Sequence, residues 1–120
     1  GGEFRVLLVP GEITPGLVSG TGDMLAENSI TNRASGFKSL CDIVGGDTVI
    51  FGLANDALGY IIPDNDYCMF FAGYGKLAEK LFFKDYAHYQ EMFSIGAHTA
   101  SAFAAGVEDM MKNFKARLNK

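Results

Sequence analysis

Two short apolar runs, each bordered by turn-forming residues, constrain the fold of this chain more than any other feature. Residues 4–9 form a nearly continuous apolar run that stops at Pro10-Gly11, and residues 48–53 follow the turn signal Gly45-Gly46-Asp47. Short runs of this kind, bounded by glycine and proline, are typical of strands that are buried on both faces of a sheet. The sequence therefore predicts two buried strands, at about 4–9 and 48–53.

The clearest helical pattern lies at the C-terminal end, from His98 to Leu118. Basic residues occupy its last turns, where the helix dipole favours cations. Apolar residues recur on one face at helical spacing, namely Phe103, Val107, Met110, Met111, Phe114 and Leu118. We expect a long, surface-packed amphipathic helix. Weaker patterns suggest helices at 24–30 and 76–83, and a short helix or strand at 37–43.

These elements predict an α/β fold with a small sheet, in a single domain that spans residues 1–120. A two-stranded sheet is marginal by itself and needs more strands or a covering layer. The start, Gly1-Gly2-Glu3-Phe4, has no methionine and no signal-peptide pattern, which suggests a cloning scar or an internal boundary. We therefore expect an incomplete part of a larger α/β domain.

Composition argues against several kinds of partner. The formal charge is −4, and the ten basic residues are scattered rather than gathered into a stripe that could neutralise phosphates, so nucleic acid is not an expected partner. No apolar run approaches the ~18–20 residues of a membrane-spanning helix. Cys41 and Cys68 are too few for a disulfide scaffold or a metal knuckle, and whether they meet stays open.

Polar residues follow both predicted strands and form one candidate site. Glu12 comes just after the first strand, while Asn55 and Tyr60 follow the second. Ligands in open α/β sheets usually bind at such strand ends. Each residue also has a structural interpretation: Glu12 as a solvated loop carboxylate, Tyr60 as a core ring with its hydroxyl on a backbone carbonyl, and Asn55 as a turn residue.

No catalytic residue is expected within this chain itself. His88 and His98 lie ten residues apart with no glutamate or cysteine at metal-ligand spacing. Ser94 and Ser101 lack the glycine-flanked turn of a hydrolase nucleophile. The strand-end residues are thus the main candidates for a functional role.

Four motifs in order point to a known family. They are Val9-Pro10-Gly11-Glu12, then Phe51-Gly52-Leu53-Ala54-Asn55, then Gly59-Tyr60-Ile61, and finally the set Tyr89, Glu91, Gly96, His98 and Thr99. In order and approximate spacing, over nearly the whole chain, this pattern resembles the neutral, non-lysosomal ceramidases. The resemblance implies that the chain is the C-terminal segment of a larger hydrolase catalytic domain.

Members of that family are zinc-dependent amidases that cleave the N-acyl bond of ceramide into sphingosine and a fatty acid. The resemblance implies that Glu12 and Tyr60 are metal ligands, and it leaves Asn55 as a candidate substrate-binding residue. The family's histidine ligands belong to sequence that precedes this part. The resemblance therefore implies zinc in the complete enzyme but none bound by this chain alone, with the N-terminal remainder of the domain as its partner and a lipid-like or amide substrate. It also suggests a secreted or cell-surface location, although this chain contains no signal peptide.

The chain departs from the family pattern at three places, which keeps the substrate open, and one of them is that the region from Tyr89 to Thr99 aligns only with a gap. Residues 19–23 replace a basic Gly-Arg-Arg run, and Ile62-Pro63 replaces two threonines. A related amide or ester hydrolase is therefore an alternative to a ceramidase. A second alternative is a free-standing, non-catalytic interaction module, and a third is a small α/β protein with an unrelated ligand. The module would dock, or self-associate, through aromatic residues, since aromatics are enriched in interface cores. These are Phe70, Phe71, Phe82, Phe83 and Tyr86.

Overall fold

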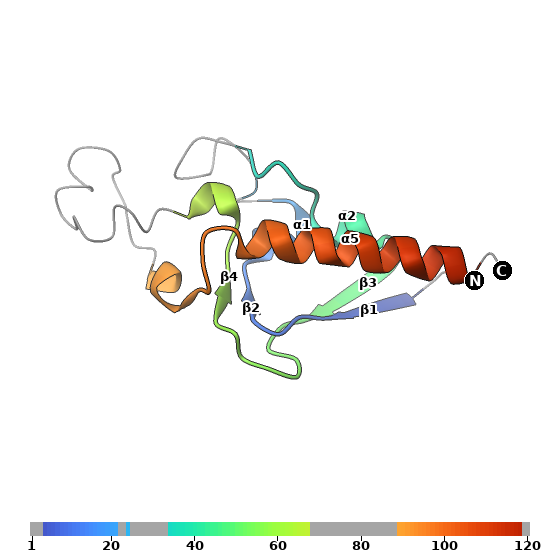
Figure 1. Cartoon of the computed structure of the whole chain (residues 1–120), viewed down its shortest axis with the longest axis horizontal. Coiled ribbons are helices and arrows are strands. Elements are labelled where there is room, and N and C mark those ends of the chain that lie inside the picture. Colours follow the sequence, from blue (N-terminus) through green and yellow to red (C-terminus); the bar gives the residue numbers. More distant parts are fainter. Residues whose placement is uncertain (1–3, 22–23, 25–33, 68–88, 119–120) are drawn as a thin grey trace.

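The computed structural model describes residues 4–21, 24, 34–67 and 89–118 (Figure 1). The strands are β1 (Phe4–Leu8), β2 (Glu12–Ile13), β3 (Asp47–Phe51) and β4 (Tyr60–Ile61). The α-helices are α1 (Pro15–Ser19), α2 (Leu40–Val44) and α5 (Thr99–Leu118), and two short 3-10 helices are η3 (Asp64–Asp66) and η4 (Tyr89–Phe93). The chain is thus an α/β structure with small parallel sheets and a long C-terminal helix.

The strands β1 and β3 correspond to the two predicted apolar runs. They pair in parallel, with Phe4 opposite Asp47 and Leu8 opposite Phe51. The strand β1 ends one residue before the predicted position and β3 ends two residues before it, because the chain turns soon after Leu8 and after Phe51. The turn at Gly45-Gly46 leads directly into β3, as its sequence predicts.

A short interruption separates this sheet from a second parallel pair, β2 and β4. The loop after β3 wraps around the turn after β1: the amide of Val9 donates to the Phe51 carbonyl at 2.9 Å, and the amide of Leu53 donates to the Gly11 carbonyl at 2.9 Å. Val9 is fully buried at this junction. The two small sheets are therefore successive parts of one parallel ribbon, bent where Pro10 and Gly11 stand.

The helix α5 confirms the strongest helical prediction and covers one face of the β1–β3 sheet (Figure 1). Its residues Ala100, Ala104, Val107 and Met111 are buried. Ala100, Val107 and Met111 join a core that includes residues of β1 and α2, and α2 packs against α5. The segment 37–43, predicted as a helix or a strand, contains the start of the helix α2.

The expectation that both strands are buried on both faces is wrong for the residues that the structure describes. On β1 only Leu7 is buried, whereas Phe4, Val6 and Leu8 are 69%, 50% and 50% exposed. Val49 and Phe51 of β3 pair with Val6 and Leu8 and are exposed too. The reason is that α2 and α5 cover a single face, so the other face of the sheet stays open.

The apolar stripe of α5 is likewise only partly covered. Val107 and Met111 lie in the core, but Met110, Phe114 and Leu118 are exposed. The predicted helix at 76–83, most of the one at 24–30 and the five aromatic residues of the expected docking face lie outside the described residues. Within the described part of the chain, no helix has both the length and the apolar character that crossing a membrane requires.

Candidate functional site

The strands β2 and β4 bring together the two residues that the family resemblance implies as metal ligands. Glu12 and Tyr60 are direct register partners in this parallel pair. The Glu12 amide donates to the Gly59 carbonyl at 2.9 Å, and the Thr14 amide donates to the Ile61 carbonyl at 3.1 Å, which fixes the register on both sides. Glu12 is exposed and Tyr60 is half-buried. Both side chains belong to neighbouring positions of one small sheet.

Two glycines allow the chain segments to cross closely beside this pair. A Cβ atom on Gly11 would lie 2.7 Å from the Gly59 carbonyl oxygen. Gly59 has φ +91°, and a Cβ atom there would lie 1.8 Å from the carbonyl oxygen of Phe93. No side chain fits at either position without displacement of the backbone. The glycine before Glu12 and the glycine before Tyr60 therefore set the close approach of the two strands.

A third segment reaches Tyr60 from the other side. Ser94, just after η4, forms a parallel bridge with Tyr60, so that Tyr60 lies between Glu12 and Ser94. The Ser94 hydroxyl is buried, with no hydrogen-bond partner among the described residues. The site thus combines backbone from three parts of the chain. The sequence pattern does not reveal Ser94 as its third member.

An acidic side chain is buried near the same bridge. Glu91 of η4 is 1% exposed and is among the largest fully buried side chains of the described structure. The pKa of Tyr67 is raised above its ordinary value, first by burial and second by the negative charge of Glu91. Glu91 of η4 therefore lies close enough to Tyr67, in the segment after η3, to act on it electrostatically.

Asn55 takes a structural role in this fold. Its φ of +69° lies in the left-handed region, which asparagine tolerates better than most residues, and its side chain is exposed. The adjacent Asp56 carboxylate accepts a hydrogen bond from the Ala57 amide at 2.8 Å. Both residues shape the loop between β3 and β4, in keeping with the turn interpretation. A role of Asn55 in substrate binding stays a prediction.

A polar cluster at the start of α5 joins residues that the sequence does not connect. The Asp64 carboxylate accepts hydrogen bonds from the Ser101 hydroxyl at 2.6 Å and from the Ser101 amide at 3.1 Å. Its Oδ2 atom also lies 2.9 Å from Nδ1 of His98. The carboxylate stands between the serine and the histidine, which is not the order of a nucleophile, base and orienting acid. It caps the first turn of α5, where the helix dipole favours a negative charge.

The donor set at Glu12 and Tyr60 fits part of a zinc site. A carboxylate and a phenol offer oxygen ligands, but a catalytic zinc ion usually takes three protein ligands. Among residues 4–67 and 89–118, apart from the undescribed gaps, no group of three or more His, Cys, Asp or Glu side chains is placed to hold a metal ion. Further ligands would have to come from outside these residues.

Comparison with known proteins adds no relative: no protein-family model, no curated protein and no solved structure matches the chain.

Proposed function

We propose that this chain is the C-terminal segment of a zinc-dependent hydrolase domain that resembles the neutral ceramidases and cleaves an amide bond of a lipid-like substrate. The observation that supports this proposal is the parallel register of β2 and β4, in which Glu12 stands directly opposite Tyr60. These are the two residues that the family resemblance implies as metal ligands. They lie far apart in the sequence, so their pairing comes from the fold.

The register makes a shared ion sterically reasonable. Neighbouring strands lie about 4.8 Å apart, and register partners in a parallel pair project to the same face of the sheet. Zinc–oxygen bonds are about 2.0–2.2 Å long, so two ligand atoms on one tetrahedral ion lie about 3.4 Å apart, a distance that side chains from neighbouring strands reach by leaning toward each other. Glu12 is exposed and can orient its carboxylate freely, whereas Tyr60 is half-buried between two backbone neighbours.

In this proposal Glu12 and Tyr60 hold the metal ion from one side. Zinc, when bound, polarises a substrate carbonyl and provides a hydroxide near neutral pH. The close crossing at Gly11 and Gly59 keeps the two ligand strands at a constant spacing. The N-terminal remainder of the domain supplies the other ligands and the substrate contacts. The open face of the β1–β3 sheet supports this view, since parallel sheets are usually covered on both faces.

A zinc titration of this chain followed by NMR tests the proposal. Two ligands do not hold zinc stably, so the isolated chain should retain no zinc after dialysis. At high zinc concentration we expect only fast, weak contact that shifts the signals of Glu12 and Tyr60, and we expect Glu12→Gln and Tyr60→Phe each to abolish these shifts. The matched control is Asp109→Asn, which removes an exposed carboxylate on α5 and should leave the shifts unchanged. Shifts at other residues, or shifts that persist in both ligand variants, would reject the metal site.

A second candidate function, a non-catalytic interaction module, is supported by the same open face. Phe4, Val6, Leu8, Val49 and Phe51 form a contiguous apolar surface on β1 and β3. Surfaces of this kind mark interaction sites or incomplete domains. Solution mass and thermal melting separate the two: a monodisperse monomer with a cooperative melt favours the module, whereas concentration-dependent association favours the incomplete domain.

A further inference from the structure

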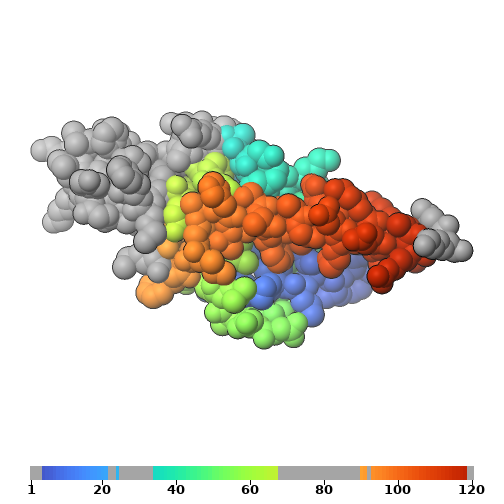
Figure 2. Space-filling model, in the orientation of Figure 1, coloured from blue at the N-terminus to red at the C-terminus, as the bar shows by residue number. Residues whose placement is uncertain are grey.

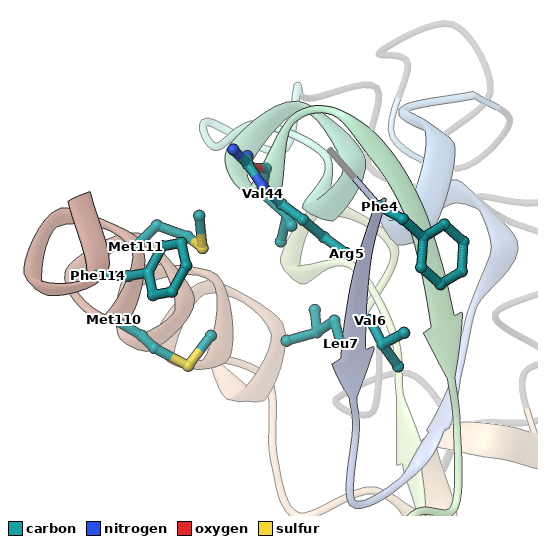
Figure 3. A pocket seen from close by; sticks show the side chains of 8 residues that line it. All are labelled: Phe4, Arg5, Val6, Leu7, Val44, Met110, Met111 and Phe114. Carbon is teal, nitrogen blue, oxygen red and sulfur yellow. The ribbon is translucent and has the colours of Figure 1, made fainter. Parts of the chain in front are cut away.

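Two hollows lie along the helix α5, on opposite sides of it. In the space-filling view, residues 34–44 (cyan) follow one side of α5 and β1 (blue) follows the other (Figure 2). The hollow beside β1 has a volume of about 280 Å³, and apolar side chains line most of it (Figure 3). Among the described residues that line it, Arg5 alone is charged, and its guanidinium donates to the Val44 carbonyl. The lining of this first hollow therefore does not indicate a particular ligand.

The second hollow lies between α5 and the loop 34–38, and its volume is about 580 Å³. This size is typical of small-molecule sites, which enclose about 300–1,000 Å³. Small side chains on α5 leave the space open, since Ser101, Ala104 and Ala105 line it. In the loop, Gly36 has φ +78°, and apart from its chain neighbours nothing lies within 4 Å of a Cβ atom placed there. Small residues thus form parts of both walls.

Two opposite charges border the second hollow. Lys38 brings an ammonium group from the loop, and Glu108 brings a carboxylate from α5. Among the described residues, neither side chain forms an ion pair or a hydrogen bond with another. The neighbouring base Lys112 pairs with Asp109 at 3.1 Å. Glu108 is half-buried, and burial penalises a carboxylate unless a cation pairs with it. The second hollow therefore offers one base and one acid to a ligand.

Apolar surface completes the lining of the second hollow. Phe37 of the loop is half-buried and packs against the core, and Ala104 of α5 is 2% exposed. Both residues are held in place by their neighbours, so they form a fixed surface against which a ligand can bury apolar area. A molecule that matches the whole lining carries an ammonium group, a carboxylate and an apolar body.

We propose that the second hollow binds a small zwitterion of the amino-acid class with an apolar side chain. Glu108 contacts its ammonium group, Lys38 contacts its carboxylate, and its apolar body packs against Phe37. A simple cation or a simple anion leaves one of the two charges unmatched and binds more weakly. The hollow contains neither Glu12 nor Tyr60 and requires no metal ion, so this inference stands apart from the proposed function.

A titration with L-phenylalanine, followed by NMR, tests this site. We expect saturable shifts at the amides of Gly36 and Ala105, with a dissociation constant on the order of 1 mM, because two solvent-accessible charge contacts contribute little each. Phenylalaninamide lacks the carboxylate, and N-acetylphenylalanine lacks the ammonium group. Each of these two ligands should bind at least about threefold more weakly than phenylalanine.

Two variants assign the two charges of the ligand. Lys38→Met should weaken the binding of phenylalanine at least about threefold but leave phenylalaninamide unaffected, because that ligand has no carboxylate. Glu108→Gln should likewise weaken phenylalanine but leave N-acetylphenylalanine unaffected. The matched controls Lys115→Met and Asp47→Asn change exposed charges outside the hollow, so they should leave all three affinities unchanged.

A third variant tests the space rather than the charge. Ala105→Leu places a larger side chain in the second hollow from an exposed position on α5, where leucine is a good helix former. We expect it to abolish the binding of phenylalanine. Ala116→Leu is the matched control, because Ala116 is exposed on the same helix outside the hollow. Circular dichroism checks that both variants fold.

Three results would overturn the proposal. The first is the absence of saturable shifts at about tenfold the expected dissociation constant. The second is equal affinity of the native chain for phenylalanine, phenylalaninamide and N-acetylphenylalanine, which means that the charges are not recognised. The third is an equal loss of affinity in Lys115→Met and Lys38→Met, which means that net charge and not the hollow determines binding.

Discussion

The two small sheets of this chain differ in what holds their strands together. At β2 and β4 the backbones cross so closely that glycine is required at positions 11 and 59, and a third segment completes the contact through Ser94. At β1 and β3 the strands are longer and regularly paired, yet one face and one edge carry exposed apolar side chains. The first region is closed by backbone contacts within the chain, whereas the second presents surfaces that other polypeptide segments can cover.

The largest effect that this comparison predicts comes from Gly59→Ala. The new methyl group would overlap the Phe93 carbonyl, and φ +91° is strained for alanine, so we expect a loss of about 3 kcal/mol or more in the free energy of unfolding. Urea unfolding followed by circular dichroism measures this change.

The matched control for Gly59→Ala is Gly106→Ala within α5. Apart from the backbone of its own helix and its chain neighbours, nothing lies within 4 Å of a Cβ there, and alanine favours helix, so this variant should gain about 0.5–1 kcal/mol. If Gly59→Ala folds with unchanged stability, the close crossing of β4 and η4 does not exist in solution.

Neighbouring leucines on β1 separate the covered face of the first sheet from its open face. Leu7 is 6% exposed and Leu8 is 50% exposed. We expect Leu7→Ala to cost about 2–5 kcal/mol, because it leaves a cavity beneath α5, and Leu8→Ala to cost less than about 1 kcal/mol. Thermal and urea unfolding give both values. Equal losses in the two variants would mean that the open face of β1 is covered in solution.

Asp64 lies just after the strand β4 and binds Ser101 near the start of α5. A substitution of Asp64 therefore measures how much this contact contributes to holding α5 in place. Asp64→Ala removes hydrogen bonds to the amide and hydroxyl of Ser101, so we expect a loss of about 1–2 kcal/mol in unfolding free energy. Asp109→Ala breaks only an exposed pair with Lys112 and should cost less than about 0.5 kcal/mol. Chemical denaturation of both variants makes the comparison, and similar small losses would show that Asp64 does not cap α5.

The smallest effect concerns pH and the raised pKa of Tyr67. The pKa of Tyr67 is raised in the folded chain, so the unfolded chain releases this proton first as the pH rises. The contribution of Tyr67 to the free energy of unfolding is therefore constant at lower pH, and it declines above the ordinary tyrosine pKa of about 10. Urea midpoints on both sides of that pH should show a steeper decline for the native chain than for Tyr67→Phe. Parallel declines would mean that Tyr67 titrates normally.

The parts of the fold that were predicted correctly follow from local periodicity. The helix α5 and the strands β1 and β3 each have a strong hydrophobic pattern, and their positions agree with the prediction within two residues. The coverage of the strands was not predictable in this way, because an apolar run does not say whether its second face meets another part of the same chain. The strands β2 and β4 were missed as elements since two residues are too few for a periodic pattern.

The candidate site was predictable only in part for a related reason. Glu12 and Tyr60 were chosen as residues that follow strands, and the observed register places them side by side. Their role as metal ligands remains a prediction. Ser94 and the cluster of Asp64, His98 and Ser101 depend on contacts between distant segments. The one local signal for that cluster was a serine and a histidine at helical spacing near the start of α5.

The parallel pairing in both small sheets has a consequence for how fast the chain folds. Phe4 pairs with Asp47 and Glu12 with Tyr60, which are 43 and 48 residues apart, so a long loop must close before the first bond between strands can form. Such non-local contacts slow folding compared with helical bundles of similar size. The helix α5, whose intrahelical backbone hydrogen bonds are all local, can form early and offer its apolar stripe as a surface on which the strands assemble. The time spent before the strands meet is the period in which this chain is most exposed to aggregation.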